Sequence, residues 1–265
     1  MTSPVVALVK QKRIAELISL GKRLDERGLT DYREAQIEIG VIEKAEGSAR
    51  VRLGKTEVLV GIKIGLGEPF SDVPNQGVLT VNAELVPLAS PTFEPGPPGE
   101  DAIELARVVD RGIRESKAID LEKLCITPGK KVFIIFIDLY VLNYDGNLID
   151  ASALAALAAL LNTKVFNYEV KEGEVQIKPG YKSLPIRNYP IAVTFAKIND
   201  KLVVDPCLEE EQVMETRLTM TIEKDEKVCA LQKSGKGYFR IQQILEAAKI
   251  ARQKAAELRK LVVKK

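Results

Sequence analysis

The chain has 265 residues, of which 46% are hydrophobic and 29% are charged, and its formal net charge is +2. This composition favours a folded protein with a large core and excludes strong overall electrostatic attraction to nucleic acid. The sequence has no histidine, which excludes sites that use a histidine as general base. Its three cysteines, Cys125, Cys207 and Cys229, lack the spacing of a zinc site, so we expect reduced, partly buried thiols.

The longest apolar runs cover residues 132–137 and 151–161. A membrane-spanning helix needs about 18–20 apolar residues, so neither run is long enough. Residues 1–20 carry basic residues within an amphipathic pattern and lack the cleavage site of a signal peptide. We therefore expect a cytoplasmic protein with no membrane association.

The first half of the sequence begins with an amphipathic segment at residues 5–20, which predicts a helix, and continues with a polar stretch at 22–34. Four segments then show the alternation that is typical of strands: 35–43, 48–53, 57–64 and 78–87. The glycines between the first three indicate an antiparallel meander. A proline-rich loop at 87–99 leads into a predicted helix at 100–117, whose apolar face would contain Ile103, Val108 or Val109, and Ile113.

Residues 132–142 form a nearly continuous β-prone apolar run, which predicts a buried central strand. A turn at 143–147 and a buried helix at 151–161 follow. Six further strands are predicted, the first two of them joined around Gly173: 165–170, 174–177, 191–197, 201–204, 216–223 and 227–233. The last predicted element is a long helix at 238–261.

A sheet followed by helices, twice along the chain, predicts an α+β fold of two related sheet-plus-helix halves with an extra N-terminal helix. Four parts are expected: a helical extension at 1–30, a first half at 31–165, a connector at 166–190, and a second half at 191–265.

Three strings in this order resemble the RNase PH family, and the likeness extends over about residues 23–261. They are ELARVVDRGIR at 104–114, the segment at 132–159 that joins a strand, an Asp-Gly turn and a helix, and VVDPCLEEE at 203–211. Each string alone is only moderately specific, whereas their order and spacing together are distinctive. The resemblance implies an RNase PH-like fold, and it points most closely to a non-catalytic ring subunit of the archaeal exosome.

In active members of this family, inorganic phosphate attacks the 3′ end of RNA. The turn before the buried helix is rich in hydroxyl residues and carries an arginine, so that it binds phosphate at a helix N-terminus. Here the stretch at 145–152 reads DGNLIDAS, with Leu148 and Ile149 where donors would stand. Asp150 would place a negative charge at the entrance and is predicted to cap the helix. Asp150 and Ser152 therefore read as a vestigial phosphate site.

The acidic residues of the family are partly kept. Asp205 and Glu210 or Glu211 match its carboxylate positions, but Thr216 and Arg217 stand where active members tend to carry another acid. A carboxylate pair without bound phosphate has no nucleophile to assist. We therefore assign no catalytic residue, treat Asp205 and Glu211 as vestigial, and expect neither a metal nor a cofactor.

Arg107, Arg111 and Arg114 recur at positions i, i+4 and i+7 of the helix at 100–117, which places them on one face. Nearby acids leave open a purely structural, salt-bridged surface. The resemblance favours RNA binding, since this helix approaches RNA in the family and arginine forks suit phosphate oxygens.

The resemblance implies that three copies of the chain assemble with three copies of an active RNase PH-like subunit into a hexameric ring. RNA-binding cap subunits would sit on one face. The chain would then support 3′–5′ phosphorolytic degradation, and tailing, of RNA by its partner. Two alternatives stay open: an independently active phosphorolytic exoribonuclease that uses Asp205 and Glu211, and an RNA-binding protein without a fixed partner.

Overall fold

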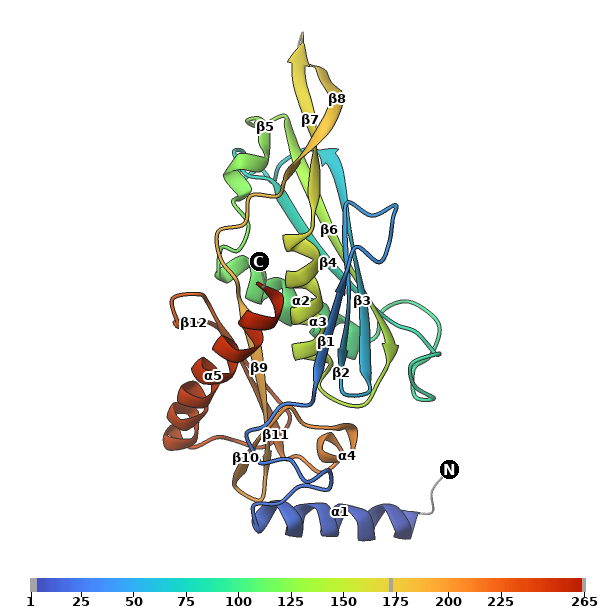
Figure 1. Ribbon diagram of the computed structural model, residues 1–265, viewed down its shortest axis with the longest axis vertical. Helices are drawn as coiled ribbons and strands as arrows, with labels where there is room; N and C mark the ends of the chain where they lie inside the picture. The colour runs from blue at the N-terminus through green and yellow to red at the C-terminus, as the bar shows by residue number, and fades with distance from the viewer. Residues whose placement is uncertain (1–3, 172–173, 264–265) are drawn as a thin grey trace.

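The computed structural model describes residues 4–171 and 174–263, and its two larger sheets lie one in each half of the chain (Figure 1). The first sheet contains six strands: β1 (Ala35–Ile39), β2 (Gly47–Leu53), β3 (Thr56–Gly67), β4 (Val78–Leu85), β5 (Cys125–Thr127) and β6 (Lys131–Asn143). The second contains four: β9 (Ile191–Ile198), β10 (Lys201–Val204), β11 (Thr216–Ile222) and β12 (Val228–Ser234).

The order of the first sheet is β1-β2-β3-β6-β4, with β5 paired to β6. The predicted antiparallel meander over β1, β2 and β3 is confirmed. The predicted central strand, β6, lies between β3 and β4, which explains why its sequence is apolar almost throughout. β4 joins the sheet at the far edge and runs parallel to β6, an arrangement that alternation alone could not reveal.

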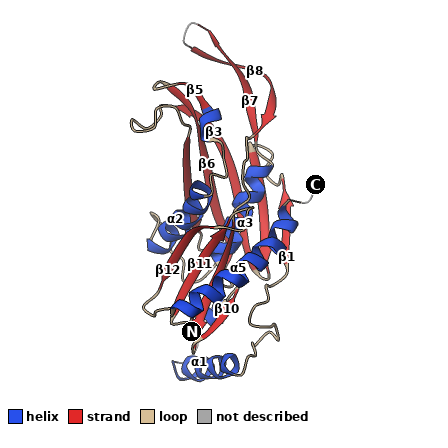
Figure 2. Ribbon diagram, turned by 90° about the vertical axis from the view of Figure 1, so that its left-hand side faces the viewer, coloured by secondary structure: helices blue, strands red, loops and turns tan. Residues whose placement is uncertain are grey.

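Helices α2 (Glu100–Glu115) and α3 (Leu148–Leu161) pack against the first sheet, and α5 (Ile241–Val262) packs against the second (Figure 2). α3 also contacts β9, so it lies in the layer that the two halves share. Almost all of its residues are buried, as predicted from its Ala/Leu-rich sequence. The α+β fold of two sheet-plus-helix halves is confirmed.

The N-terminal helix, α1 (Pro4–Ser19), is also confirmed. Ile14 and Ile18 pack against Ala196 and Ile198 of the second sheet, so the extension is anchored to the second half of the chain. None of the described helices, α1 included, is both long and apolar enough to cross a lipid bilayer.

The predicted strands of the connector form a separate two-stranded sheet, β7 (Lys164–Lys171) and β8 (Glu174–Ser183), which projects from one end of the molecule (Figure 1). Phe133 of β6 packs edge-on against Phe166 and Tyr168 at the base of this hairpin. Gly173, where the turn was predicted, lies outside the described residues.

Two local predictions were wrong. The side chain of Ile103 is 49% exposed, because the buried face of α2 passes instead through Leu105, Val109 and Ile113. α3 begins at Leu148, before the predicted start at residue 151, since the turn at Gly146 and Asn147 leads directly into the helix. The three cysteines are free and partly buried, as expected.

Candidate functional site

The Asp-Gly turn at 145–146, before α3, packs closely against the acidic stretch at 203–211 in the second half of the chain. Gly146 has a φ of +85°, and a Cβ atom there would lie 2.4 Å from the carbonyl carbon of Cys207 and 2.5 Å from the nitrogen of Leu208. The amide of Leu208 donates a hydrogen bond to the carbonyl of Asp145 at 3.1 Å. Only glycine fits this close approach, and it brings the N-terminus of α3 beside α4 (Leu208–Glu211).

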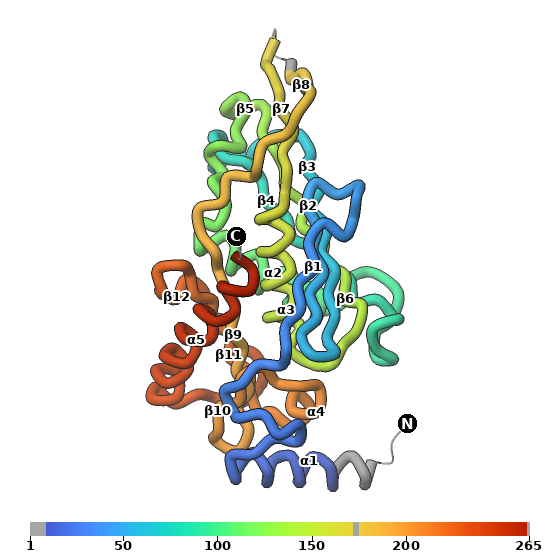
Figure 3. Tube along the Cα trace, viewed as in Figure 1, coloured from blue at the N-terminus to red at the C-terminus, as the bar shows by residue number. Residues whose placement is uncertain are grey.

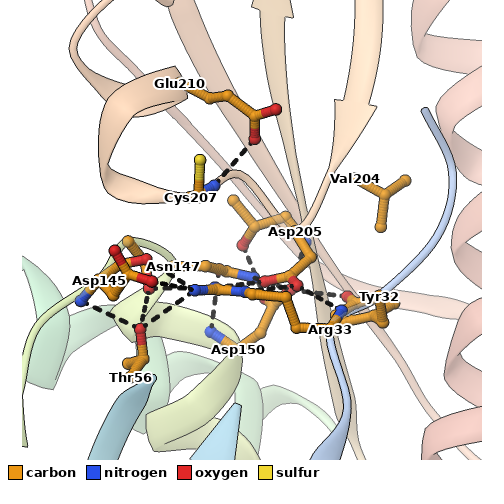
Figure 4. A network of polar contacts seen from close by, with 12 residues as sticks. Tyr32, Arg33, Thr56, Asp145, Asn147, Asp150, Val204, Asp205, Cys207 and Glu210 are labelled. Carbon is orange, nitrogen blue, oxygen red and sulfur yellow. Dashed lines mark hydrogen bonds and ion pairs between the residues drawn. The ribbon is translucent and has the colours of Figure 1, made fainter. Parts of the chain in front are cut away.

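Asp205 lies at the centre of a buried polar network (Figure 4). The Arg33 guanidinium donates to both of its carboxylate oxygens, from Nη2 at 2.7 Å and from Nε at 2.9 Å. The Arg33 backbone amide donates a further hydrogen bond at 2.8 Å. Arg27 and the side-chain amide of Asn147 donate at 3.0 and 2.7 Å. The carboxylate is fully buried and both of its oxygens are engaged, so it has a structural role here.

Glu210 is held in the same way. Arg23, whose side chain is fully buried, donates to its two oxygens at 2.8 and 2.5 Å. Arg23, Arg27 and Arg33 all belong to the segment between α1 and β1, which runs past α4 on its way to the first sheet (Figure 3). This segment therefore ties the acidic stretch to the first half of the molecule.

Asp150 is buried, with an exposed fraction of 3%. It accepts hydrogen bonds from the Tyr32 hydroxyl at 2.7 Å, from Asn147 at 2.9 Å, and from the amide and hydroxyl of Thr194 at 3.0 and 2.7 Å. Burial raises the pKa of this carboxyl to about 6, and the hydrogen bonds oppose that rise. Asp150 thus links α3 to β9 and to the segment before β1.

The prediction that Asp150 caps α3 and faces the entrance was wrong. The cap is Asn147, which has a φ of +51° and whose side chain accepts from the Asp150 amide. An asparagine tolerates this left-handed backbone better than most residues. Asp150 comes three residues later and points inward, where its oxygens accept from Tyr32 and Asn147 of its own half and from Thr194 of the other half.

Glu211 is the carboxylate that lies at the helix entrance. It accepts from the backbone amide of Asn147 at 2.9 Å and from the Tyr144 hydroxyl at 2.6 Å. Burial raises its pKa above the ordinary value. Because Glu211 takes a backbone donor at the start of α3, that donor is not available to an anion.

A cleft of about 460 Å³ opens in front of the α3 N-terminus, lined by residues of both halves that include Leu148 and Ile149. Its charged lining residues are three acids and one base: Asp101, Glu104, Glu211 and Arg217. The single guanidinium lies 3.0 Å from Glu104 and 4.0 Å from Glu211. A net negative lining with apolar side chains at the helix end disfavours phosphate.

Ser152 lies on α3 and is fully buried. Its hydroxyl has no hydrogen-bond partner among the described residues, and Ser152 does not line the cleft. Within the described part of the chain, no group of three or more acidic or cysteine side chains could hold a metal ion.

The three arginines of α2 lie together on the surface. Arg107, Arg111 and Arg114 line a shallow depression of about 360 Å³ with Val81 of β4 and Asp110. Arg111 donates to Gln232 of β12 at 2.8 Å, so the depression lies between edge strands of the two sheets. We call these three residues the arginine surface.

The partners of these buried carboxylates were not predicted from the sequence. The polar stretch at 22–34 predicts no contact for Tyr32 or Arg33, and the turn at 143–147 predicts none for Asn147. Three arginines within residues 22–34 were the available clue. Their partners are more than 170 positions away, so no local pattern could pair them.

Fold and sequence together place the chain in a family. Residues 31–165 match the 3′ exoribonuclease family, domain 1, and residues 188–254 match its domain 2, the two domains of RNase PH. The chain belongs to this family, which confirms the resemblance seen in the sequence.

Particular relatives are similar over nearly their whole lengths. The chain is 56% identical to the exosome complex component Rrp42 of Thermococcus kodakarensis over 98% of this chain and 96% of that protein. The corresponding Methanothermobacter thermautotrophicus protein is 48% identical, over 96% and 94%. A chain of the Archaeoglobus fulgidus exosome with RNA bound to the active site superposes with a TM-score of 0.89 and 48% identity, covering 97% and 98%.

A chain of an archaeal exosome core gives a TM-score of 0.87 at 43% identity, covering 98% of both chains. The rice protein Rrp46 gives a TM-score of 0.68 at 16% identity, covering 89% of this chain and 96% of that one, which indicates a shared fold alone.

Proposed function

We propose that this chain is a ring subunit of an exosome that degrades RNA by phosphorolysis from the 3′ end, and that it contributes no catalytic residues of its own. Proteins similar to this chain over nearly their whole lengths are named exosome components, and similar chains come from exosome structures, one with RNA bound to the active site. An active RNase PH-like sister subunit would supply the chemistry.

The observation that carries the non-catalytic role is the contact between Glu211 and the start of α3. Phosphorolysis needs an anion cradle with free donors and cationic side chains. Here the amide of Asn147 is bonded to Glu211, and the cleft in front of it has a net negative lining. Bound phosphate would meet repulsion where active relatives provide attraction.

The same contacts argue against an independently active exoribonuclease that uses Asp205 and Glu211. Asp205 is fully buried and already bonded to Arg27, Arg33 and Asn147. It would have to leave these partners before it could bind a metal or transfer a proton. Asp205, Glu211, Asp150 and Ser152 are better explained as vestiges of an ancestral site, three of which now stabilise the fold.

We assign RNA binding to the arginine surface. Its three guanidinium groups face one depression and would contact phosphates, which gives sequence-independent binding of the kind that a general RNA-degrading complex needs. The partners would be an active RNase PH-like subunit, in three heterodimers, and RNA-binding caps. The hexameric arrangement, the caps and the cytoplasmic location stay predictions.

Assembly tests the ring against the third possibility, an RNA-binding protein without a fixed partner. The purified chain would be mixed with an active RNase PH-like subunit from a closely related exosome, and the mass measured by light scattering. We expect a closed particle of six chains. A mixture that contains only the separate components would contradict the proposal.

RNA affinity of the assembled ring tests the arginine surface. We expect Arg107→Glu and Arg111→Glu each to weaken binding at moderate salt without changing the mass of the ring. Arg50→Glu is the matched control, because Arg50 lies on β2, away from α2, and pairs with the acids Glu38 and Glu57. Unchanged RNA affinity in both α2 variants would refute this assignment.

A further inference from the structure

The three guanidinium groups of the arginine surface differ in how free they are. Arg107 is exposed and has no hydrogen-bond or ion-pair partner among the described residues. Arg111 uses one nitrogen, Nη1, to donate to Gln232 at 2.8 Å. Arg114 donates from Nε and Nη2 to the two oxygens of Asp110, at 3.1 and 2.7 Å, and from Nη2 to the carbonyl of Leu79 at 3.1 Å.

The contact between Asp110 and Arg114 uses the edge of the guanidinium that a phosphate would use. Two parallel N–H groups that point at two oxygens form the bidentate geometry by which arginine recognises carboxylates and phosphates alike. Nε and Nη2 make up one such fork, and Asp110 occupies it. Phosphate could reach Arg114 by this fork only if it displaced Asp110.

Asp110 is well placed to be displaced. Its side chain is 27% exposed and that of Arg114 is 41% exposed, so the pair lies at the solvent boundary. Exposed ion pairs between residues four positions apart on a helix are weak. Asp110 also lines the same depression as Arg107 and Arg111, and its negative charge lowers the attraction of the whole depression for phosphate.

We propose that Asp110 is an internal competitor of RNA, which occupies Arg114 and keeps the affinity of the arginine surface low, while Arg107 makes the first phosphate contact. This inference rests on the proposed RNA-binding role of the arginine surface. A weak contact of this kind lets a strand move past the ring without being held.

A different role for Asp110 predicts the opposite change in RNA affinity when its charge is removed. If Asp110 served to hold Arg114 in the orientation that binds RNA, removal of its charge would weaken binding. If it acts as a competitor, the same change frees one fork and one positive charge, and binding tightens. The substitution Asp110→Asn keeps the size of the side chain and therefore separates the two roles.

The experiment measures the affinity of the assembled ring for a fluorescent single-stranded oligoadenylate, without inorganic phosphate so that no RNA is degraded. For Asp110→Asn we expect tighter binding by about two- to fivefold, which is the strength of an exposed ion pair expressed as an affinity ratio. The plot of log affinity against log salt should steepen by about 0.7, the value for one more phosphate contact on a single strand.

Glu115→Gln is the matched control, because Glu115 lines the same depression but has no ion-pair partner among the described residues. It removes the same charge and frees no arginine, so its effect should be smaller. The double variant Asp110→Asn/Arg114→Ala should lose the gain.

The outcomes separate the two proposals. If Arg107→Ala and Arg111→Ala both leave RNA affinity unchanged, the arginine surface itself is refuted, and if only Arg107→Ala does so, the first phosphate contact assigned to Arg107 is overturned. If Arg107→Ala weakens binding but Asp110→Asn leaves it unchanged or weakens it, the surface stands and the competitor role is overturned. An equal gain from Glu115→Gln would also overturn it, because the effect would then be one of charge alone.

Discussion

Arg33 holds both carboxylate oxygens of Asp205, at 2.7 and 2.9 Å, and so joins the segment before β1 to the turn before α4. Asp205, which the resemblance predicts to match an acidic position of the RNase PH family, is fully buried. This ion pair and the one between Arg23 and Glu210 connect the acidic stretch at 203–211 to the segment that leads into the first sheet.

Arg33→Ala should destabilise the chain by about 3–5 kcal/mol, because it leaves the buried charge of Asp205 without its main partner. Chemical unfolding followed by circular dichroism measures this loss. Arg50→Ala provides the control, since Arg50 pairs with Glu38 at the surface and should cost less than about 1 kcal/mol. An equal loss of unfolding free energy in the two variants would show that the ion pair between Arg33 and Asp205 does not stabilise the chain.

Asp150 should make the stability of the chain depend on pH. Its pKa in the folded chain is about 6, above the ordinary value of 3.8, so the folded state binds the proton more tightly than the unfolded state. The stabilisation from this group is therefore complete below pH 3.8 and is lost as the pH rises through 6.

Asp150→Asn removes that titration. The advantage of the natural chain over this variant should shrink by roughly 2 kcal/mol between pH 4 and pH 7, because the unfolded carboxyl is already partly ionised at pH 4. Unfolding free energies measured at several pH values provide the comparison. A difference that does not vary with pH, or that grows toward pH 7, would mean that burial does not raise this pKa.

Gly146→Ala should be more damaging than its backbone angle alone would suggest. Gly129 also has a positive φ, +70°, but nothing lies within 4 Å of a Cβ atom there. Gly129→Ala should therefore cost about 1–2 kcal/mol from the left-handed backbone. The Cβ of Gly146→Ala would overlap the backbone at Cys207 and Leu208 and should cost about 1–3 kcal/mol more. Similar melting temperatures for both variants would contradict the close approach.

Glu211→Gln should leave turnover by the assembled ring unchanged within about twofold, whereas loss of a true general acid or base costs about a hundredfold or more. The amide oxygen of glutamine can still accept from Asn147. The rate of nucleoside diphosphate release by the ring is the measurement. A hundredfold loss, in a ring of unchanged mass, would restore Glu211 to the list of catalytic groups.

Local patterns predicted much of the fold. The apolar run of β6, the Ala/Leu-rich α3 and the alternating strands of both halves were all visible in the sequence. The parallel pairing of β4 with β6 was not, because strand order depends on long-range packing. The start of α3 was not predicted for a similar reason. Asn147 adopts a left-handed conformation, and the contact of its backbone amide with the distant Glu211 stabilises it.

At the site, the sequence shows that positions 148 and 149 are leucine and isoleucine, so side-chain donors for phosphate are missing there. It could not show which carboxylate takes their place. Asp150 was the nearest candidate along the chain, but the fold turns it inward and brings Glu211 to the helix entrance instead. The roles of Arg23, Arg27 and Arg33 could not be predicted either, since their acidic partners are distant in sequence.

We propose above all that this chain depends on a sister subunit for its chemistry. The most direct test is phosphate-dependent release of nucleoside diphosphates from single-stranded RNA, measured for the chain alone and after assembly with an active RNase PH-like partner. We predict no release by the chain alone and rapid release by the assembled ring. Rapid release by the chain alone would contradict the account.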